Sequence, residues 1–260
     1  MFDLFPRPVV FAHRGASNDA PENTLAAFEM AVRLGAEAIE LDAQLSVDLQ
    51  VVVIHDHTVD RTTDGSGKVN DLQLATLKQF DAGGHFDSTF RGERIPTLNE
   101  VFETVGQRIL INVELKNDAS IWDDLPARVA QLVIQHRLQQ RVVFSSFNPI
   151  ALIKIKRLLP DTPCGLLALS GTKGGWACAW GYKLLGCDAL HPDISSVTSR
   201  LVQRVHKSGR RIHAYTANEP EVIQRLLNFG VDGFFSDDAA LAIRQVNEWR
   251  RTAALNLNKA

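Results

Sequence analysis

The sequence predicts a (β/α)8 TIM barrel, an α/β fold in which eight parallel strands are surrounded by helices. Short β-branched and aliphatic runs alternate with helical patterns along most of the chain. Eight such runs begin near residues 9, 38, 109, 141, 165, 189, 211 and 233. The length of 260 residues also suits a single barrel domain. An open doubly wound sheet is the alternative, but no GxGxxG sequence opens the first helix.

The first strand and helix have clear boundaries in the sequence. Residues 9–12 form the first apolar run, and Pro21 precedes a helical pattern. Asn23 or Thr24 can cap this helix, and Gly35 can end it. Apolar residues follow at helical spacing: Leu25, Phe28 and Val32.

The second strand is predicted to extend into a β-hairpin. The apolar runs 38–41 and 51–54 are separated by 44–50, with turn-forming Ser46 and Asp48. This connection is too short for a parallel crossover, which needs about a dozen residues or more. We therefore expect residues 38–55 to form one long hairpin, counted as one barrel position.

Residues 57–95 are rich in glycine and polar residues and lack the strand–helix alternation of the rest of the chain. We expect this segment to be a small insertion that caps the barrel. The whole chain, residues 1–260, is expected to form one domain. A short helix is expected at 72–80. Regular alternation resumes after Pro96, where Thr97 and Glu100 have capping-box spacing. The remaining strands are expected at 109–115, 141–144, 165–169, 189–190, 211–215 and 233–235, and helices at 125–138, 149–159, 198–208 and 220–229.

Two later segments are predicted to lack regular structure. Trp176 and Trp180 stand among several glycines and are expected in a long loop at the barrel top. This loop is expected to cover the core, and the alternative is that its indoles contact an alkyl or choline group. The polar end, residues 256–260, is expected to be a frayed tail.

The charge balance argues against a nucleic-acid-binding protein. The chain has 28 Lys and Arg against 30 Asp and Glu, a net charge of −2 and a pI near 6.4. A few local cations would still suffice for a small anionic substrate. The apolar content of 45% and charged content of 22% predict a folded protein and not a disordered chain.

The cysteine count and apolar runs bear on the compartment. The chain has an odd number of cysteines, without CxxC spacing: Cys164, Cys178 and Cys187. We therefore expect free thiols in a reducing compartment. No apolar run is long enough for a membrane span, and residues 1–10 lack the apolar core of a signal peptide. We therefore expect a cytoplasmic protein, either a monomer or a homodimer.

Three carboxylates stand at the ends of predicted strands. Glu40 and Asp42 alternate on one face of a strand, and Glu114 follows a third strand. In an α/β barrel, the carboxyl ends of the strands form the active-site mouth. Carboxylates crowded there repel each other unless a cation compensates them. Because the group contains only oxygen ligands, it indicates one divalent cation, Mg²⁺ or Ca²⁺.

Two histidines and two cations are predicted to lie beside the carboxylates. His13 and His55 each directly follow an apolar run, and histidines are suited to general acid and general base catalysis near neutral pH. Arg14 and Lys116 can donate hydrogen bonds to a phosphate. This combination indicates displacement at phosphorus, with the acid and base not yet distinguished.

These segments resemble the glycerophosphodiester phosphodiesterase family, in its short cytoplasmic bacterial form. The resemblance covers nearly the whole chain and rests on several ordered motifs: HRG at 13–15, PENT at 21–24, IELD at 39–42, VIHD at 53–56, DRTTDG at 60–65, IPTL at 95–98, NVELK at 112–116, GVDG at 230–233 and SD at 236–237.

The resemblance implies metal-dependent hydrolysis of glycerophosphodiesters, such as glycerophosphocholine and glycerophosphoethanolamine, to glycerol 3-phosphate and an alcohol. It gives the catalytic roles to His13 and His55 and the phosphate contacts to Arg14 and Lys116. The metal ligands would be Glu40, Asp42 and Glu114. The hydroxyl next to the phosphodiester would attack phosphorus, and water would open the resulting cyclic phosphate. The insertion would shape the pocket for the glycerol end.

Two further residues are candidates for the pocket wall. Tyr215 stands where many members of the family have a tryptophan, and His191 ends a predicted strand. Two other functions remain as alternatives: a barrel lyase that acts on lipids, and a non-catalytic barrel that binds a phosphate ester or a metal.

Overall fold

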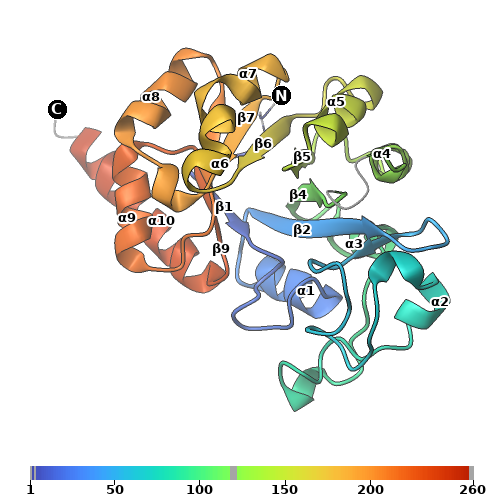
Figure 1. Ribbon diagram of the computed structural model, residues 1–260. Helices are drawn as coiled ribbons and strands as arrows, with labels where there is room; N and C mark the ends of the chain where they lie inside the picture. Colours follow the sequence, from blue (N-terminus) through green and yellow to red (C-terminus); the bar gives the residue numbers. More distant parts are fainter. Residues whose placement is uncertain (1, 3, 118–121, 258–260) are drawn as a thin grey trace.

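The computed structural model describes residues 2, 4–117 and 122–257. Within this part, eight parallel strands close into a barrel with helices around it, which confirms the predicted fold class (Figure 1). The hydrogen-bonded order is β1-β9-β8-β7-β6-β5-β4-β2, and β1 pairs with β2 to complete the ring. The strands are β1 (Val9–Ala12), β2 (Ala38–Leu45), β4 (Leu110–Leu115), β5 (Val142–Ser146), β6 (Cys164–Ala168), β7 (Ala189–Pro192), β8 (Arg211–Ala214) and β9 (Gly233–Ser236).

The predicted hairpin is present. Strand β3 (Val51–Val53) pairs antiparallel with the end of β2, outside the ring. Strand β2 is long because its second half extends beyond the barrel to meet β3, as Figure 1 shows at the right. The hairpin delivers the segment after β3 back to the barrel mouth.

Helices cover the outside of the barrel, and their caps agree with the sequence signals. Thr24 caps α1 by accepting from the Ala27 backbone, and Thr97 and Glu100 form a capping box at α3. The outer helices are α1 (Leu25–Arg33), α3 (Leu98–Val105), α4 (Leu125–Gln135), α5 (Pro149–Leu158), α8 (Ser199–Lys207), α9 (Pro220–Phe229) and α10 (Ala239–Leu257). None of the described helices is long and apolar enough to cross a bilayer.

The segment 57–95 packs around a small apolar cluster of its own. Val59, Val69, Leu77 and Ile95 are buried against the hairpin residue Val52. The helix expected at 72–80 is shorter than predicted, since α2 covers only Leu74–Leu77. Single turns of 3₁₀-helix flank it at η1 (Val69–Asp71) and η2 (Ser88–Phe90).

The predicted loop around Trp176 and Trp180 is instead helical. The structure has α6 (Gly171–Trp176), the π-helix η3 (Ala177–Gly181) and α7 (Tyr182–Leu184) in one continuous run. Two glycines of this run, Gly174 and Gly181, are sites of close packing. A Cβ on Gly174 would overlap the Leu169 carbonyl, and one on Gly181 would overlap the Trp176 ring. Close packing against neighbouring residues of the same segment therefore offsets the weak helix propensity of these two glycines.

The expected tail is also partly helical. Helix α10 continues to Leu257, two residues into the segment predicted as frayed, and the rest of that prediction lies outside the described residues.

The amino-terminal end of the barrel is closed by the segment before β1. Phe2 and Phe5 are buried there, and their carbonyls accept hydrogen bonds from the Arg211 guanidinium at 2.9 and 3.0 Å. The same guanidinium lies 4.6 Å from the centre of the Phe2 ring. With this end closed, the mouth at the carboxyl ends of the strands is the accessible end of the barrel.

A buried histidine pair fills part of the barrel interior. His213 Nδ1 lies 3.1 Å from His191 Nε2, and both side chains are fully buried. Their outer ring nitrogens have no hydrogen-bond partner within the described part of the chain. Gly165 makes room for the pair, because a Cβ there would lie 2.3 Å from His191 Nε2. Burial lowers the pKa of His191 to about 3, and burial also lowers that of His213.

The histidine pair predicts a loss of stability in acid. Between pH 6.5 and about 3, the unfolded chain protonates His191 while the folded chain keeps it neutral, so the free energy of unfolding falls as pH falls. Each such histidine contributes a slope of up to about 1.4 kcal/mol per pH unit. We expect His191→Leu to flatten this dependence in denaturant unfolding curves recorded from pH 7 to pH 4.

His85→Leu is the matched control, because His85 is exposed in the described structure. It should keep the wild-type slope. Equal slopes for the wild type and His191→Leu would contradict the prediction, whatever the absolute stability of the variant.

Candidate active site

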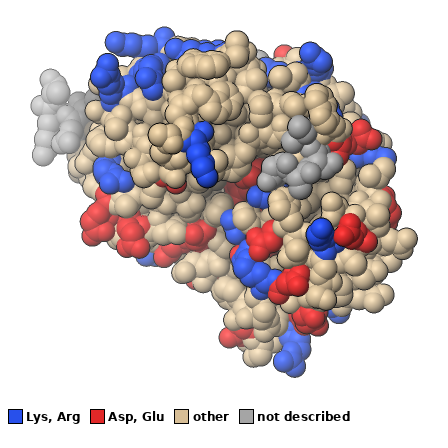
Figure 2. Space-filling view, viewed as in Figure 1, with Lys and Arg blue, Asp and Glu red and all other residues tan. Residues whose placement is uncertain are grey.

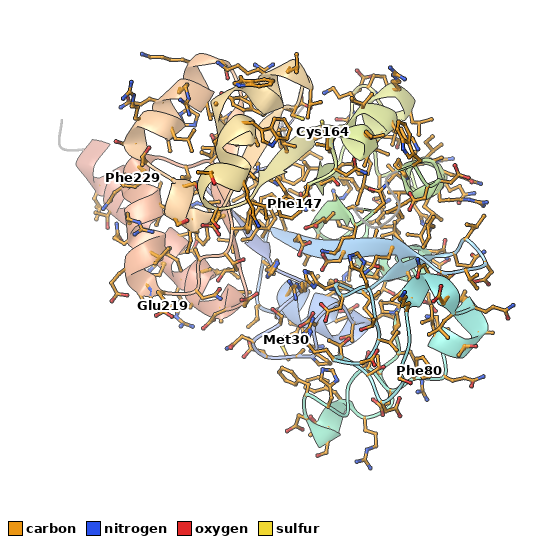
Figure 3. The ribbon with its side chains drawn as sticks, in the orientation of Figure 1. Met30, Phe80, Phe147, Cys164, Glu219 and Phe229 are labelled. Atoms are coloured by element: carbon orange, nitrogen blue, oxygen red, sulfur yellow. The ribbon has the colours of Figure 1, made fainter. Side chains whose placement is uncertain are left out.

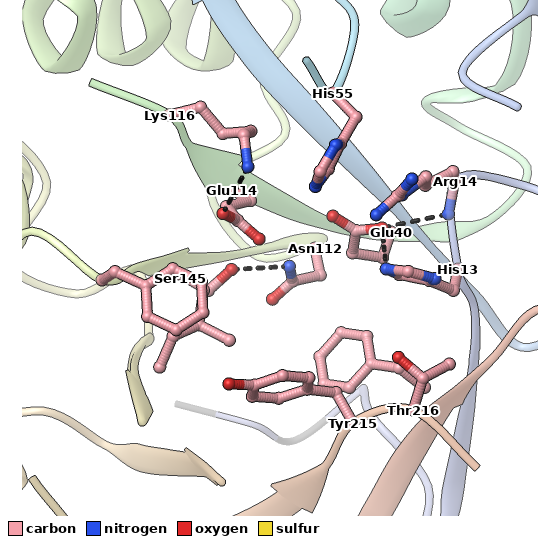
Figure 4. Close-up of a pocket in the computed structure, with 13 residues that line it drawn as sticks. His13, Arg14, Glu40, His55, Asn112, Glu114, Lys116, Ser145, Tyr215 and Thr216 are labelled. Atoms are coloured by element: carbon pink, nitrogen blue, oxygen red, sulfur yellow. Dashed lines mark hydrogen bonds and ion pairs between the residues drawn. The ribbon is translucent and has the colours of Figure 1, made fainter. Parts of the chain in front are cut away.

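A cavity of about 230 Å³ opens at the carboxyl ends of the strands. One side is polar and the other is apolar (Figure 4). Phe147, on the apolar side, lies near the centre of the ring of strands in Figure 3. The lining residues are His13, Arg14, Glu40, His55, Asn112, Glu114, Lys116, Ser145, Phe147, Leu167, Tyr215, Thr216 and Phe235.

The three predicted carboxylates meet on the polar side. Glu40 and Asp42 extend from the same face of β2, and the parallel register places Glu114 of β4 beside Asp42. One oxygen from each of these side chains can be chosen so that all three lie within 4.8 Å of one another. Glu40 and Asp42 are almost fully buried. Asp42 lies behind the cavity lining, whereas Glu40 and Glu114 face the cavity.

The carboxylates are incompletely compensated by the protein. Burial raises the pKa of Glu40 strongly, and the neighbouring Asp42 and Glu114 add to this effect. Burial and the Asp42 charge raise the pKa of Glu114 to about 7. Glu40 Oε1 is buried without a hydrogen-bond partner among the described residues. Converging oxygens and an unpartnered buried atom fit a divalent cation, which would offset the repulsion.

Two cations approach Asp42 from opposite sides. Arg14 Nε lies 3.6 Å from Asp42 Oδ2, and Lys116 Nζ lies 3.8 Å from Asp42 Oδ1. Lys116 Nζ also lies 3.4 Å from Glu114 Oε1. Burial alone would raise the pKa of Asp42, but Lys116, His55 and Arg14 hold it below its ordinary value. Asp42 is therefore the member of the group whose negative charge the protein compensates best.

An unusual backbone turn positions Arg14. Arg14 has a φ of 59° and Gly15 a φ of 84°, both in the left-handed region. This turn aims the Arg14 N–H at Glu40 Oε2, 3.0 Å away. Gly15 is required here, because a Cβ would lie 2.7 Å from Ala27 as well as being strained by the positive φ.

His13 is oriented by a carboxylate from the far end of the chain. His13 Nδ1 lies 2.6 Å from Asp237 Oδ1, just after β9, and Asn218 donates to the other Asp237 oxygen at 2.6 Å. Burial opposes ionisation of Asp237, but the bonds from His13 and Asn218 lower its pKa to about 2. Asp237 is therefore an acceptor, so Nδ1 of His13 carries the hydrogen. Nε2 lies on the side of Glu40, 3.8 Å from Oε2.

His55 has the same arrangement with a carboxylate next to it in the chain. His55 Nδ1 lies 2.6 Å from Asp56 Oδ1. Gln44 fixes the turn by donating to three carbonyls, those of Ile54, His55 and Asp56, at 2.8 to 3.0 Å. Burial lowers the pKa of His55, partly offset by the charge of Asp42.

A chain of ion pairs connects the 57–95 segment to both sides of the site. Arg61 donates to both Asp56 oxygens, at 2.6 and 3.1 Å, and to both Glu22 oxygens, at 2.7 and 2.8 Å. Glu22 also accepts from Arg14 at 2.9 Å. Arg61 therefore links the partner of His55 to the partner of Arg14, and its hydrogen bonds keep the pKa of Asp56 well below the ordinary value.

The opposite wall of the cavity is aromatic and aliphatic. Phe147, Leu167, Tyr215 and Phe235 line it. The Tyr215 ring meets Phe147 edge to face at 6.1 Å, and its hydroxyl donates to the Ala168 carbonyl at 2.9 Å. Tyr215 thus lines the apolar side of the cavity. His191 is not among the residues lining this cavity, because it is buried in the barrel interior against His213.

Several residues of the site were given no role by the sequence. Asp56, Glu22 and Arg61 stand inside quoted motifs, but the spacing alone does not pair them. Asp237 directly follows β9, so the rule that barrel sites form at strand ends could have identified it. The apolar wall residues Phe147 and Phe235 carry no signal that separates them from ordinary core residues.

Comparison with known proteins identifies the family. The family model for the glycerophosphoryl diester phosphodiesterase family matches residues 13–241. The chain belongs to this family, whose members are phosphoric diester hydrolases. A glycerophosphodiester phosphodiesterase of Caldanaerobacter subterraneus is 39% identical over 93% of this chain and 99% of the relative. A Bacillus subtilis relative of the same name is 31% identical over 89% of this chain and 84% of its own.

Solved structures agree with this assignment. An Oleispira antarctica phosphodiesterase, in complex with the product sn-glycerol 3-phosphate, matches with a TM-score of 0.86 and 34% identity. The match covers 93% of this chain and 97% of the other. A glycerophosphodiester phosphodiesterase from Agrobacterium tumefaciens matches with a TM-score of 0.77 and 28% identity, over 90% of this chain and 98% of its own.

The carboxylate group predicts a specific response to divalent cations. Mg²⁺ or Ca²⁺ at about one hundred times its dissociation constant should raise the melting temperature by roughly 5 °C or more, because binding favours the folded state. Glu40→Gln should lose this response. Without metal, the same variant should melt no lower than the wild type, because it relieves repulsion with Asp42 and Glu114. Differential scanning calorimetry with each metal and with EDTA measures both effects.

Glu221→Gln, at an exposed position on α9, is the matched control and should respond to metal as the wild type does. A Glu40→Gln protein that retains the full metal-induced shift would show that the cation binds elsewhere.

Proposed function

We propose that this chain hydrolyses glycerophosphodiesters, such as glycerophosphocholine and glycerophosphoethanolamine, to glycerol 3-phosphate and the free alcohol. The observation that carries the proposal is the convergence of two carboxylate-oriented histidines, three carboxylates and two cations on one cavity. The product seen in the Oleispira antarctica relative supports a phosphodiester of glycerol as the substrate class.

Glu40, Asp42 and Glu114 would hold one divalent cation, Mg²⁺ or Ca²⁺. When bound, such a cation polarises phosphoryl oxygens and stabilises negative charge that develops on them. Arg14 and Lys116 lie on the same side of the cavity and would bind the phosphate oxygens. Because both cations also contact Asp42, they hold the metal-ligating group in place as well as facing the substrate.

His13 and His55 would transfer the protons. Each ring directs Nδ1 to a carboxylate at 2.6 Å, which leaves Nε2 for exchange with the substrate. One histidine would take the proton from the attacking hydroxyl, and the other would give a proton to the leaving alcohol. The same pair in reversed roles would serve the later attack of water on a cyclic phosphate.

The two ends of the substrate would meet different surroundings. We assign the glycerol end to the side shaped by the 57–95 insertion, within one domain of residues 1–260. The alcohol end would face the apolar wall of Phe147, Leu167, Tyr215 and Phe235. Because this wall also suits an alkyl chain, hydrolysis of lysophospholipids is the second candidate function.

The remaining expectations concern location and assembly. We propose that the protein is cytoplasmic, which agrees with the three free cysteines among the described residues: Cys164, Cys178 and Cys187. It would act on a small molecule as a monomer or a homodimer.

The proposed proton transfers predict a large effect of removing either histidine. His13→Ala and His55→Ala should each lower kcat for glycerophosphocholine on the order of 10²- to 10⁴-fold. A coupled assay for glycerol 3-phosphate, with Mg²⁺, with Ca²⁺ and with EDTA, measures the rates and the metal requirement. A lysophosphatidylcholine arm in the same assay compares the second candidate function.

The control is His85→Ala, at an exposed histidine of the 57–95 segment, which should turn over normally. Full turnover by a folded His13→Ala or His55→Ala protein would refute the mechanism. Absence of glycerol 3-phosphate from the folded wild type with either metal would refute the function.

Arg61 is a positioning residue for His55, since it acts through Asp56. Arg61→Ala should lower kcat on the order of 10- to 100-fold with little change in KM, because the imidazole is no longer held in place. Arg61→Lys should restore part of the rate by supplying one of the lost hydrogen bonds. Steady-state kinetics measure both constants.

Arg91→Ala changes an exposed arginine of the same segment and should leave both constants unchanged. An Arg61→Ala enzyme that loses affinity for substrate but keeps its kcat would contradict the positioning role.

A further inference from the structure

An exposed apolar stripe runs along the helical segment that follows β6. Trp176, Trp180 and Leu184 are spaced four residues apart and are 38%, 54% and 73% exposed. Such spacing normally places apolar side chains against the core, but here the stripe faces outward. The two indoles meet edge to face with centroids 6.1 Å apart. The Trp176 ring packs directly against Gly181, where a Cβ would lie 2.2 Å from the ring.

Cations surround one side of this stripe. Lys183, Arg200, Arg204 and Lys207 line a single surface hollow between α7 and α8. Arg204 holds the two parts together by donating to the Cys178 carbonyl at 3.0 Å. Figure 2 shows Lys and Arg side chains along the upper left edge of the molecule, over α7 and α8.

No acidic residue interrupts this surface in sequence. The stretches 162–187 and 194–218 contain no Asp or Glu, although the whole chain has slightly more acidic than basic residues. The cations here are therefore not paired within their own segments, and the local charge is opposite in sign to the net charge of −2. This local surplus would attract an anionic partner.

The stripe adjoins the mouth of the barrel. Leu167 lines the cavity, and Leu169, two residues further on, is exposed at the start of the helical segment. The Tyr215 hydroxyl binds the Ala168 carbonyl between them. Because β6 and β7 are parallel, the helical segment between them starts at the mouth and runs along the outside of the barrel towards its other end. A flat partner on the stripe would therefore contact the side of the barrel next to the mouth.

We propose that the exposed stripe and the cations beside it form a docking surface for an anionic lipid bilayer. Its apolar residues are Leu169, Trp176, Trp180 and Leu184, and its basic residues are Lys183, Arg200, Arg204 and Lys207. Exposed indoles and leucines beside lysines and arginines match the layered chemistry of a membrane interface, where acyl chains lie below phosphate groups. Leucine side chains give little stacking with nucleic-acid bases, so they favour a bilayer over RNA or DNA. Binding would be peripheral and reversible.

Vesicle co-sedimentation tests this proposal with the full chain. Vesicles of phosphatidylcholine with about 30% phosphatidylglycerol should retain the wild type, whereas pure phosphatidylcholine should not. Raising NaCl to about 0.5 M should weaken binding, since salt screens the cations. The triple variant Lys183→Glu, Arg200→Glu, Lys207→Glu should have an affinity for these vesicles at least about tenfold lower than that of the wild type. The double variant Trp180→Ala, Leu184→Ser should bind less at every salt concentration.

Matched controls separate this surface from general charge and from catalysis. Arg128→Glu, Arg157→Glu and Arg225→Glu together reverse three exposed cations on other helices and should bind as the wild type does. His13→Ala should also bind normally, so that failure of the proposed function and failure of docking are distinguishable. Glycerophosphocholine turnover in detergent-free solution should be unchanged in the triple variant, with an unchanged melting temperature.

Three outcomes would overturn the proposal. One is equal retention of the wild type and the triple variant on anionic vesicles. Another is no retention of the wild type at low salt. The third is that a single-stranded oligonucleotide binds the protein more tightly than anionic vesicles do and displaces it from them. That result would assign the same surface to nucleic acid.

Discussion

The structure of the mouth depends on the electrostatic cost of burying three carboxylates together. Glu40, Asp42 and Glu114 lie on neighbouring strands with oxygens within 4.8 Å, in a place where water cannot screen them fully. Arg14 and Lys116 lower that cost at Asp42, and the Arg14 backbone N–H lowers it at Glu40. What remains is the unpartnered Glu40 Oε1. The pairing of β2 and β4 thus brings together the carboxylates that we propose as ligands of a divalent cation.

The two histidines share one local design but depend on different parts of the chain. Asp56 orients His55 from the next position, whereas Asp237 orients His13 across 224 residues of sequence. Asp56 is in turn held by Arg61, which belongs to the 57–95 segment. That segment is therefore more than a cover for the barrel, because it fixes a side chain of the site through a carboxylate. Changes in its packing would be transmitted to His55.

The apolar side of the cavity continues outward into a second surface. Leu167 faces the cavity, and beyond it Leu169 begins the segment that carries Trp176 and Trp180. The polar reaction site and the start of the exposed apolar stripe lie close together because both follow strand ends, and the stripe then runs along the outside of the barrel. The binding of a small phosphodiester and the proposed docking of a bilayer would then use neighbouring segments of one barrel, with separate residues.

The sequence by itself determined the alternation of strands and helices, the β2–β3 hairpin and the chemistry at the strand ends. Short apolar runs and capping signals are local, and the rule that strand ends meet at one mouth predicts a site from them. The helical run from Gly171 to Leu184 could not be obtained this way. Glycines are poor helix formers, and the packing of Gly174 against Leu169 and of Gly181 against Trp176 is visible only in the structure.

The tertiary structure alone decided which charges pair with which. Nothing in the spacing of Glu22, Arg61 and Asp56 shows that they form one network, because hydrogen bonds between distant segments depend on how the chain closes. The placement of His191 was decided in the same way. Its position at a strand end suggested the pocket wall, but the inward pleat of β7 buried it against His213 in the barrel interior. Sequence fixes which residue types reach the mouth, and the packing of the closed barrel decides which of them meet.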